Sequence, residues 1–261
     1  MPPASSGAAT VGTDALAVRE DRLESARALA VAQDPVLLYA LDYLQRHGFR
    51  LPGEGTQAWL WCKARAEAND TEAQLCCGIL CSLQLYGANC EDDSRKRLER
   101  LSTNGHPAAM LVLAGYAESG SLTPDGRSNS ARMLELLGMA TEQGYGPAFT
   151  QLGVLYLNGI YVPRDRGQGI ALLRQAAMHG DARGLYLLGA ALAEDSAPSV
   201  QHEGISYIVA ASQLGYAGAY RHLGYLYSDG SCGLPRSEEL SLANFFQATQ
   251  IEQDTCALIG E

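Results

Sequence analysis

The cysteines are the side chains with the most versatile chemistry in this 261-residue chain. The seven are Cys62, Cys76, Cys77, Cys81, Cys90, Cys232 and Cys256. A closed zinc site needs four thiolate or imidazole ligands, and neither the adjacent pair nor the eight residues between Cys81 and Cys90 match a zinc knuckle. An odd number with irregular spacing is also unlike a disulfide framework.

We therefore expect Cys62, Cys77 and Cys81 to be small buried hydrophobic residues, with no metal and no cofactor. A zinc site that also uses Cys76 and Cys90 is the alternative. Unpaired cysteines favour a reducing cytoplasm as the location. The first residues lack a basic cluster followed by an apolar run, so export is not expected if Met1 is the native start.

Catalytic motifs are missing from the sequence. It contains no phosphate-binding Gly-Lys-Ser/Thr loop, no His-Glu-x-x-His and no Gly-x-Ser-x-Gly nucleophile turn. Gly167-Gln168-Gly169 lacks the third glycine and the preceding strand of a dinucleotide site. The turn at 229–233 contains Ser231 and Cys232, but a turn is expected at this place in every unit described below. The sequence therefore predicts a protein that is not an enzyme.

A repeat with a period of 35 to 39 residues positions all these side chains. Its register positions are Gln33, Asn69, Gly105, Gly144, Gly180 and Gly215. After the last three, a small residue follows four positions later and a Leu-Gly pair four positions after that. A steady period of this length is typical of a solenoid.

Each unit is predicted to form two helices with two short turns. In the clearest unit, Ala148, Leu152 and Tyr156 recur every four residues and so share one side of a first helix. Gly159 ends that helix, and Asp165 is placed to cap the second helix, which Gly180 ends. Small residues at the Leu-Gly step permit close helix contact, so we expect Gly153 and Gly224 to lie where helices approach.

These residues resemble the Sel-one-like repeat, a relative of the tetratricopeptide repeat. The closest segment runs through Ala148, Leu152-Gly153, Tyr156, Gly159, Val162-Pro163-Arg164-Asp165 and Gln175 to Gly180. A second match runs through Ala219, Leu223-Gly224, Tyr227, Gly230 and Pro235. The resemblance implies an all-α solenoid of about six helix-turn-helix repeats in a right-handed superhelix, which places about thirteen helices in the chain.

The domain organisation follows from the repeat boundaries. Residues 1–13 are predicted to be a disordered tail, 14–33 a capping helix, 34–252 the six repeats and 253–261 a C-terminal tail. Phe245, Phe246 and Ala248 are expected to close the last unit.

The charge balance limits the function. Nineteen basic against 29 acidic residues give a net charge of −10, which argues against a nucleic-acid binder. The sequence contains no run of about 20 apolar residues, which is the length needed to span a membrane. The composition therefore predicts an acidic protein that binds neither nucleic acid nor membrane; its oligomeric state is left open.

The predicted function is protein–protein interaction. A solenoid offers an extended concave groove to a partner, and the resemblance implies an adaptor, a regulatory scaffold or a bacterial immunity protein. An enzyme of hydrolase type with a pocket in the groove is the alternative. The acidic charge predicts a partner with a basic patch. Positions three, six and ten after the small residue are expected to face the partner: Tyr43, His47, Gln151, Val154, Asn158, His222, Tyr225 and Asp229.

Overall fold

The computed structural model describes residues 35–46, 55–82, 91–120 and 127–257. These residues form twelve helices joined by turns, with no strand among them. The helices are α2 (Pro35–Arg46), α3 (Gly55–Glu67), α4 (Thr71–Ser82), α5 (Glu91–Thr103), α6 (Pro107–Ser119), α7 (Ser130–Glu142), α8 (Gly146–Asn158), α9 (Arg166–Met178), α10 (Ala182–Ala193), α11 (Pro198–Gln213), α12 (Ala217–Asp229) and α13 (Glu238–Ala257). The all-α fold is confirmed, whereas the predicted tail at 1–13 and capping helix at 14–33 lie outside the described residues.

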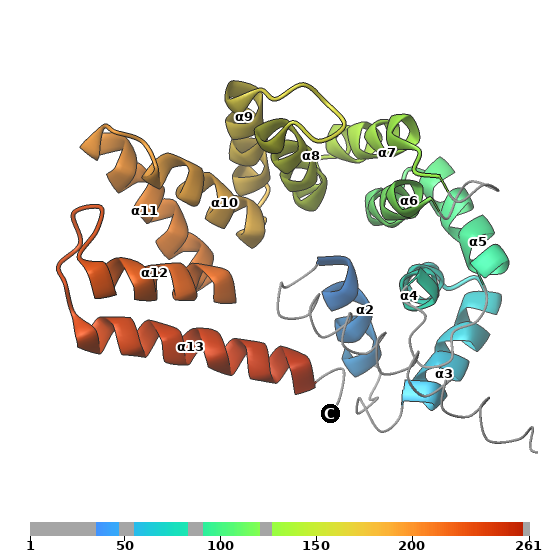
Figure 1. The fold of residues 1–261 in the computed structure, drawn as a ribbon. Coiled ribbons are helices and arrows are strands. Elements are labelled where there is room, and N and C mark those ends of the chain that lie inside the picture. The colour runs from blue at the N-terminus through green and yellow to red at the C-terminus, as the bar shows by residue number, and fades with distance from the viewer. Residues whose placement is uncertain (1–34, 47–54, 83–90, 121–126, 258–261) are drawn as a thin grey trace, which may run out of the picture.

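The helices form two layers along a curved row (Figure 1). From α4 to α11, the even-numbered first helices lie on the inside of the curve and the odd-numbered second helices on the outside, and α13 lies alongside α12 at the end of the row. Each first helix from α4 onward packs against the second helix that follows it, and neighbouring hairpins pack through the second helix of one and the first helix of the next. In the first unit, α2 and α3 both pack against α4. This is the solenoid that the period predicts.

The register positions share one backbone conformation. Asn69, Gly105, Gly144, Gly180 and Gly215 all lie in the left-handed region, with φ between 66° and 86°. Glycine adopts this conformation freely, and asparagine adopts it more readily than most residues with a side chain. Asn69 therefore replaces the glycine without breaking the repeat. Gln33 lies outside the described residues.

The turn inside each hairpin also follows the sequence pattern. Gly159 ends α8 with a φ of 69°, and Gly230 ends α12 with a φ of 67°. The carboxylate of Asp165 accepts a hydrogen bond of 2.9 Å from the amide of Gln168 and so caps α9. The predicted helix end and helix start of this unit are both confirmed.

Glycines mark the closest helix contacts. A Cβ added at Gly153 would lie 3.0 Å from the Leu173 side chain and 3.2 Å from the carbonyl oxygen of Gly169, and one at Gly224 would lie 2.8 Å from the Phe245 ring. The close approach predicted at both glycines is therefore confirmed.

A close contact between two helix backbones joins α10 to α11. A Cβ at Gly189 would meet the Gly204 carbonyl oxygen at 2.6 Å, and a Cβ at Gly204 would meet the Ala193 nitrogen at 2.6 Å. Two backbones therefore pass each other here without an intervening side chain.

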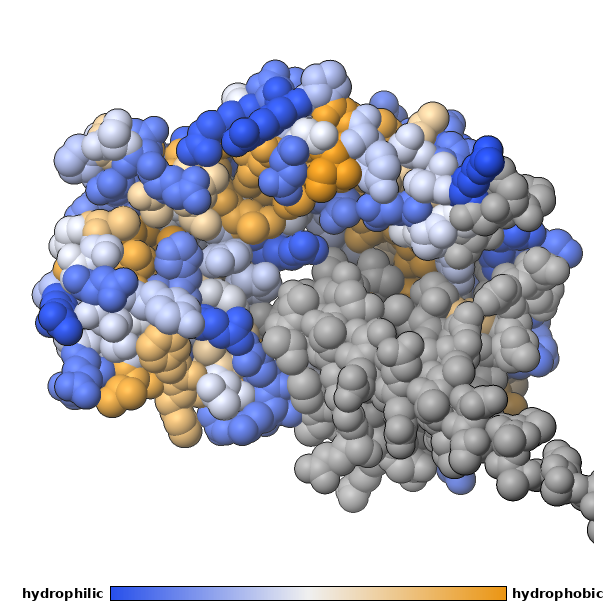
Figure 2. All heavy atoms as spheres, in the orientation of Figure 1, coloured by the Kyte–Doolittle hydropathy of each residue, from blue (hydrophilic) through white to orange (hydrophobic). Residues whose placement is uncertain are grey.

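The last hairpin closes differently from the prediction. Ala248 is buried and the Phe245 ring packs on α12, as expected. Phe246 instead turns away from α12 and is exposed, so its predicted role in closing the unit is wrong. Apolar surface is visible over α13 at the lower left of Figure 2. The helix also continues to Ala257, past residue 252 where the sequence analysis ends the repeats.

Candidate binding surface

Three first helices, α8, α10 and α12, present equivalent positions on their inner side. Their small residues Ala148, Gly184 and Ala219 set a common count. Five residues further on, Gly153, Gly189 and Gly224 contact the second helix of the same hairpin. At 3.6 residues per turn, positions three and ten after the small residue lie on the far side of the helix from this contact, and position six lies about 100° around the helix from it. Because α9 and α11 lie outside the curve (Figure 1), the positions on α8 and α10 face its inside, and those on α12 hold the same places in the repeat.

We call these nine positions the inner face. They are Gln151, Val154 and Asn158 of α8, Leu187 and Ala190 of α10 with Glu194 at its end, and His222, Tyr225 and Asp229 of α12. The residues at position three are half-buried, whereas those at position ten are exposed. The α8 and α12 members of this face were predicted from the sequence, whereas those of α10 were not. Positions three, six and ten after Gly184 are these α10 residues, so the repeat pattern in the sequence was sufficient to predict them.

The exposed end of the inner face is polar and acidic. Asn158, Glu194 and Asp229 occupy position ten in the three units, and each side chain is exposed. Two of the three carry a negative charge at neutral pH. This edge therefore offers carboxylate and amide groups to a ligand.

An aromatic cluster joins α10 to α12 beside the inner face. The Tyr186 ring lies 5.2 Å from the Tyr216 ring and 5.8 Å from the His222 ring, the second contact being edge to face. Burial raises the pKa of both tyrosine hydroxyls. Burial also lowers the pKa of His222, although Glu194 acts in the opposite direction. His222 is therefore neutral at pH 7, with one nitrogen able to donate a hydrogen bond and the other able to accept one.

Tyr225 is the most exposed aromatic residue of the inner face. Its side chain is 57% exposed, and its ring packs edge to face on Phe245 at 5.0 Å. The ring is thus supported on one side and open on the other. A supported tyrosine of this kind offers a large contact area that loses little rotamer freedom on binding.

The contact position predicted in the first unit is corrected by the structure. Tyr43 is 1% exposed and packs in the core, 6.2 Å from the Trp61 ring. Burial, ahead of nearby negative charge, raises the pKa of Tyr43 to about 12. The expectation that Tyr43 faces a partner is wrong because its ring fills space between helices. His47 lies outside the described residues.

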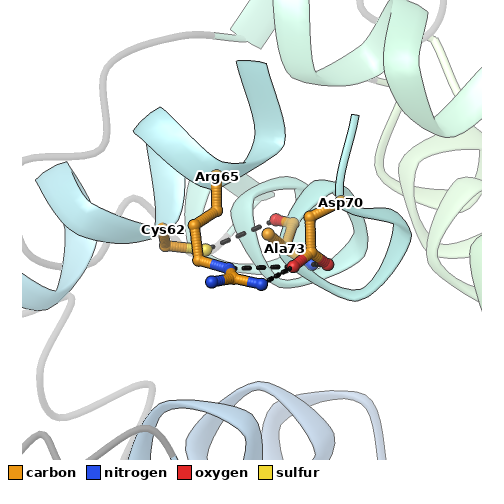
Figure 3. A network of polar contacts seen from close by, with 4 residues as sticks. All are labelled: Cys62, Arg65, Asp70 and Ala73. Carbon is orange, nitrogen blue, oxygen red and sulfur yellow. Dashed lines mark hydrogen bonds and ion pairs between the residues drawn. The ribbon is translucent and has the colours of Figure 1, made fainter. Parts of the chain in front are cut away.

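Beside Tyr43, a polar network ties α3 to the start of α4 (Figure 3). Asp70 accepts hydrogen bonds from Arg65 Nε at 2.9 Å and Nη2 at 2.6 Å, and from the Ala73 amide at 3.1 Å. Arg65 also lies 5.2 Å from the centre of the Trp61 ring. Asp70 thus caps α4 and holds Arg65 in place, a structural role that needs no ligand.

Three thiols meet in the core next to this network. The Cys77 thiol donates to Cys62 Sγ at 3.3 Å, Cys62 donates to the Ala73 carbonyl oxygen at 3.3 Å (Figure 3), and Cys76 donates to the Ala40 carbonyl oxygen at 3.7 Å. The neighbouring Cys76 thiol and burial raise the pKa of Cys62, and the Cys62 thiol and burial raise that of Cys77. Both are therefore protonated at neutral pH and pack as the predicted hydrophobic residues.

Cys81 differs from the expectation in one respect. Its side chain is buried as predicted, but it takes part in a disulfide bond. The predicted unpaired state of Cys81 is therefore wrong. Cys90 and the side chain of Cys256 lie outside what the structure describes.

Among the described residues, no group of three or more His, Cys, Asp or Glu side chains is arranged to hold a metal ion. Within the same part of the chain, no helix combines the length and apolar character needed to cross a bilayer. What the inner face offers chemically is a supported aromatic ring, a neutral imidazole and exposed carboxylates.

Comparison with known proteins agrees with the repeat register. Residues 150–181 and 217–250 match the Sel1 repeat, the Sel-one-like repeat of the sequence analysis. Both matches fall on hairpins that contribute to the inner face. None of the curated protein sequences matches this chain.

Several solved structures share the fold. A Sel1 repeat protein from Oxalobacter formigenes aligns with a TM-score of 0.64 and 20% identity, over 83% of this chain and 88% of that one. The immunity protein Pa5087 from Pseudomonas aeruginosa aligns with a TM-score of 0.58 and 17% identity, over 98% of this chain and 86% of that one.

A longer protein shares it as well. The protective antigen c5321 of uropathogenic Escherichia coli aligns with a TM-score of 0.60 and 21% identity, over 83% of this chain but only 46% of its own length. The repeat matches, the left-handed register residues and the paired helices together show that this chain contains Sel1 repeats in a solenoid of the same fold as these structures.

Proposed function

We propose that this protein is a binding module that holds another protein against the inner face of α8, α10 and α12. The observation that carries the proposal is the graded exposure of this face, from half-buried residues at position three to exposed Tyr225 and acidic residues at position ten. Interfaces commonly combine an aromatic anchor with a polar rim in this way. The repeat fold supports the proposal because its curvature creates an extended concave surface.

The partner is expected to carry a basic patch. The chain has a net charge of −10, and Glu194 and Asp229 are exposed along one edge of the inner face. Charge complementarity accelerates association more than it increases affinity, and salt screens it. The association rate should therefore fall as salt is added.

A finer proposal concerns the biological role. The Pseudomonas aeruginosa protein that aligns with almost all of this chain is an immunity protein. We propose the same kind of role here, in which this chain binds a protein toxin and blocks its activity. In this role the partner would be bound tightly and in a one-to-one ratio.

The test is purification of the tagged chain from its native host, with identification of co-purifying proteins by mass spectrometry. Once a partner is identified, Tyr225→Ala and Asp229→Lys should each weaken its binding by more than about 1 kcal/mol, roughly fivefold. Glu142→Lys is the matched control because Glu142 is exposed at the end of the second helix α7. It makes the same charge change away from the inner face.

The outcomes separate the two proposals. Unchanged affinity in both inner-face variants would place the binding site elsewhere and overturn the inner-face proposal. A partner that has no toxic activity when expressed alone would overturn the immunity role while leaving the binding module intact.

A further inference from the structure

The second helix α13 carries an uncovered apolar stripe. Leu242 and Phe246 are four residues apart, on the side of α13 that faces away from α12, and each is 62% exposed. Thr249 and Gln253 continue the same side and are also exposed. We call these four residues the terminal stripe.

The equivalent stripe on the preceding second helix is covered. Gly189 contacts Ile208 in one hairpin and Gly224 contacts Phe245 in another, so Ile208 and Phe245 are equivalent. Three residues earlier, Leu242 corresponds to Ile205, which is only 7% exposed. Four residues after Phe245, Thr249 corresponds to Ser212, which is also buried. The terminal stripe is thus a surface that elsewhere in this molecule lies inside the core.

The helix that covers α11 shows what such a stripe accepts. Ile205 shares a core cluster with Ala219, Leu223 and Leu226 of α12. These three lie at positions i, i+4 and i+7, the spacing of one apolar face of an amphipathic helix. The stripe on α13 presents the same kind of surface, so a helix with a small residue followed by two leucines at this spacing fits it.

The charge of α13 further restricts the kind of helix that can bind there. The helix contains four acidic residues, Glu238, Glu239, Glu252 and Asp254, and no basic residue. Glu252 pairs with Arg221 of α12, whereas the other three are exposed at the two ends of the helix. A second copy of α13 laid on the stripe would place like charges together. A helix with lysine or arginine beside its apolar face would instead find an opposite charge at each end.

We infer that the terminal stripe docks a basic amphipathic helix of a partner protein, laid on α13 as α12 is laid on α11. This surface is separate from the inner face and does not depend on its function. Bound in this way, the helix would extend the solenoid by one element and cover Leu242 and Phe246.

The test measures fluorescence anisotropy of a labelled helical peptide with alanine and two leucines at i, i+4 and i+7 and lysines beside them. One control peptide carries glutamate in place of each lysine. The protein variants are the double substitution Leu242→Ser with Phe246→Ser and, as a matched control, Leu214→Ser at the exposed end of α11. Circular dichroism melts check that each variant keeps the parent fold.

The expected result is binding of the lysine peptide to the parent and to Leu214→Ser with equal affinity, and at least tenfold weaker binding to the double variant. The glutamate peptide should bind the parent at least tenfold more weakly than the lysine peptide. No binding of the lysine peptide, or equal binding to the double variant, overturns the inference. Sedimentation that shows a dimer of the chain alone, abolished in the double variant, assigns the stripe to a second copy instead.

Discussion

The two halves of this solenoid hold the same repeat together in different ways. Around α2 to α6, the helices are separated by large side chains and thiols, which form one continuous core cluster that extends to α8. From α8 to α13, glycines stand at the helix contacts and the core divides into smaller clusters. A fixed period therefore sets where helices begin and end, but it leaves open how they pack.

Glycine contacts show the difference most directly. In the first half, the three atoms nearest to a Cβ at Gly78 all belong to the Leu98 side chain, at 2.6 to 2.7 Å. In the second half, a Cβ at Gly189 would meet the backbone of Gly204 as well as Ile208. A side chain can rotate aside, whereas a backbone in a packed helix cannot. The first half should therefore tolerate added volume, and the second should not.

Removal of the fully buried Tyr43 ring should have the largest effect of these changes. Tyr43→Ala is expected to lower the free energy of unfolding by about 3–5 kcal/mol because a buried ring leaves a cavity. Tyr156→Ala, at a half-buried position of α8, should cost less than about 2 kcal/mol. Urea unfolding of both variants measures the difference. Equal losses would show that the two halves share one kind of core.

Addition of a methyl group at a glycine should destabilise the protein more in the second half than in the first. Gly189→Ala is expected to cost about 1–3 kcal/mol because its Cβ would press on the Gly204 carbonyl, and Gly78→Ala should cost less. Gly138→Ala in α7 is the matched control: nothing lies within 4 Å of its Cβ, so alanine should stabilise the helix by about 0.5–1 kcal/mol. Thermal melts that rank Gly78→Ala as the most harmful would contradict this account of the packing.

Helix caps should have smaller effects that are similar in the two halves. Asp70→Ala and Asp165→Ala each remove an N-cap and should cost about 1 kcal/mol, with Asp70 slightly the more costly because it also pairs with Arg65. Chemical denaturation of the two variants at pH 7 provides the comparison. A negligible cost at either position would mean that its cap bond does not persist in solution.

The contribution of Asp70 should also depend on pH. Partial burial raises its pKa, but the Ala73 amide and Arg65 together bring the pKa of Asp70 below its usual value. Because the folded pKa lies below the unfolded one, the stabilisation is complete above about pH 4 and is lost as the pH falls through the folded value. Asp70→Asn should remove this acid-dependent part. An unchanged pH profile between pH 2 and 5 in that variant would count against it.

The thiols of the first half should react more slowly than the thiol of the second half. Cys62, Cys76 and Cys77 are buried, and the pKa values of Cys62 and Cys77 are raised, so all three should resist iodoacetamide at pH 8 in the folded protein. The half-buried Cys232 in the second half should react faster. Mass spectrometry of the alkylated peptides, with urea-unfolded protein as the reference, gives the order. Rapid labelling of Cys62 would indicate that α3 and α4 open in solution.

The sequence by itself determined the local features of this protein. The register glycines and Asn69 predicted the turns because left-handed backbone is a property of a single residue. Asp165 predicted a helix start because a cap bond spans only three residues. The inner face of α8 and α12 followed from helix periodicity.

Only the tertiary structure decided which residues are covered. Tyr43 and Tyr225 were both predicted to face a partner, yet helices cover Tyr43 while Tyr225 stays open on Phe245. Phe246 was predicted to close the last unit but lies on the uncovered side of α13. The disulfide of Cys81 was not foreseen either. Burial and pairing depend on side chains that other elements bring near, and these neighbours are not encoded in the local pattern around any one residue.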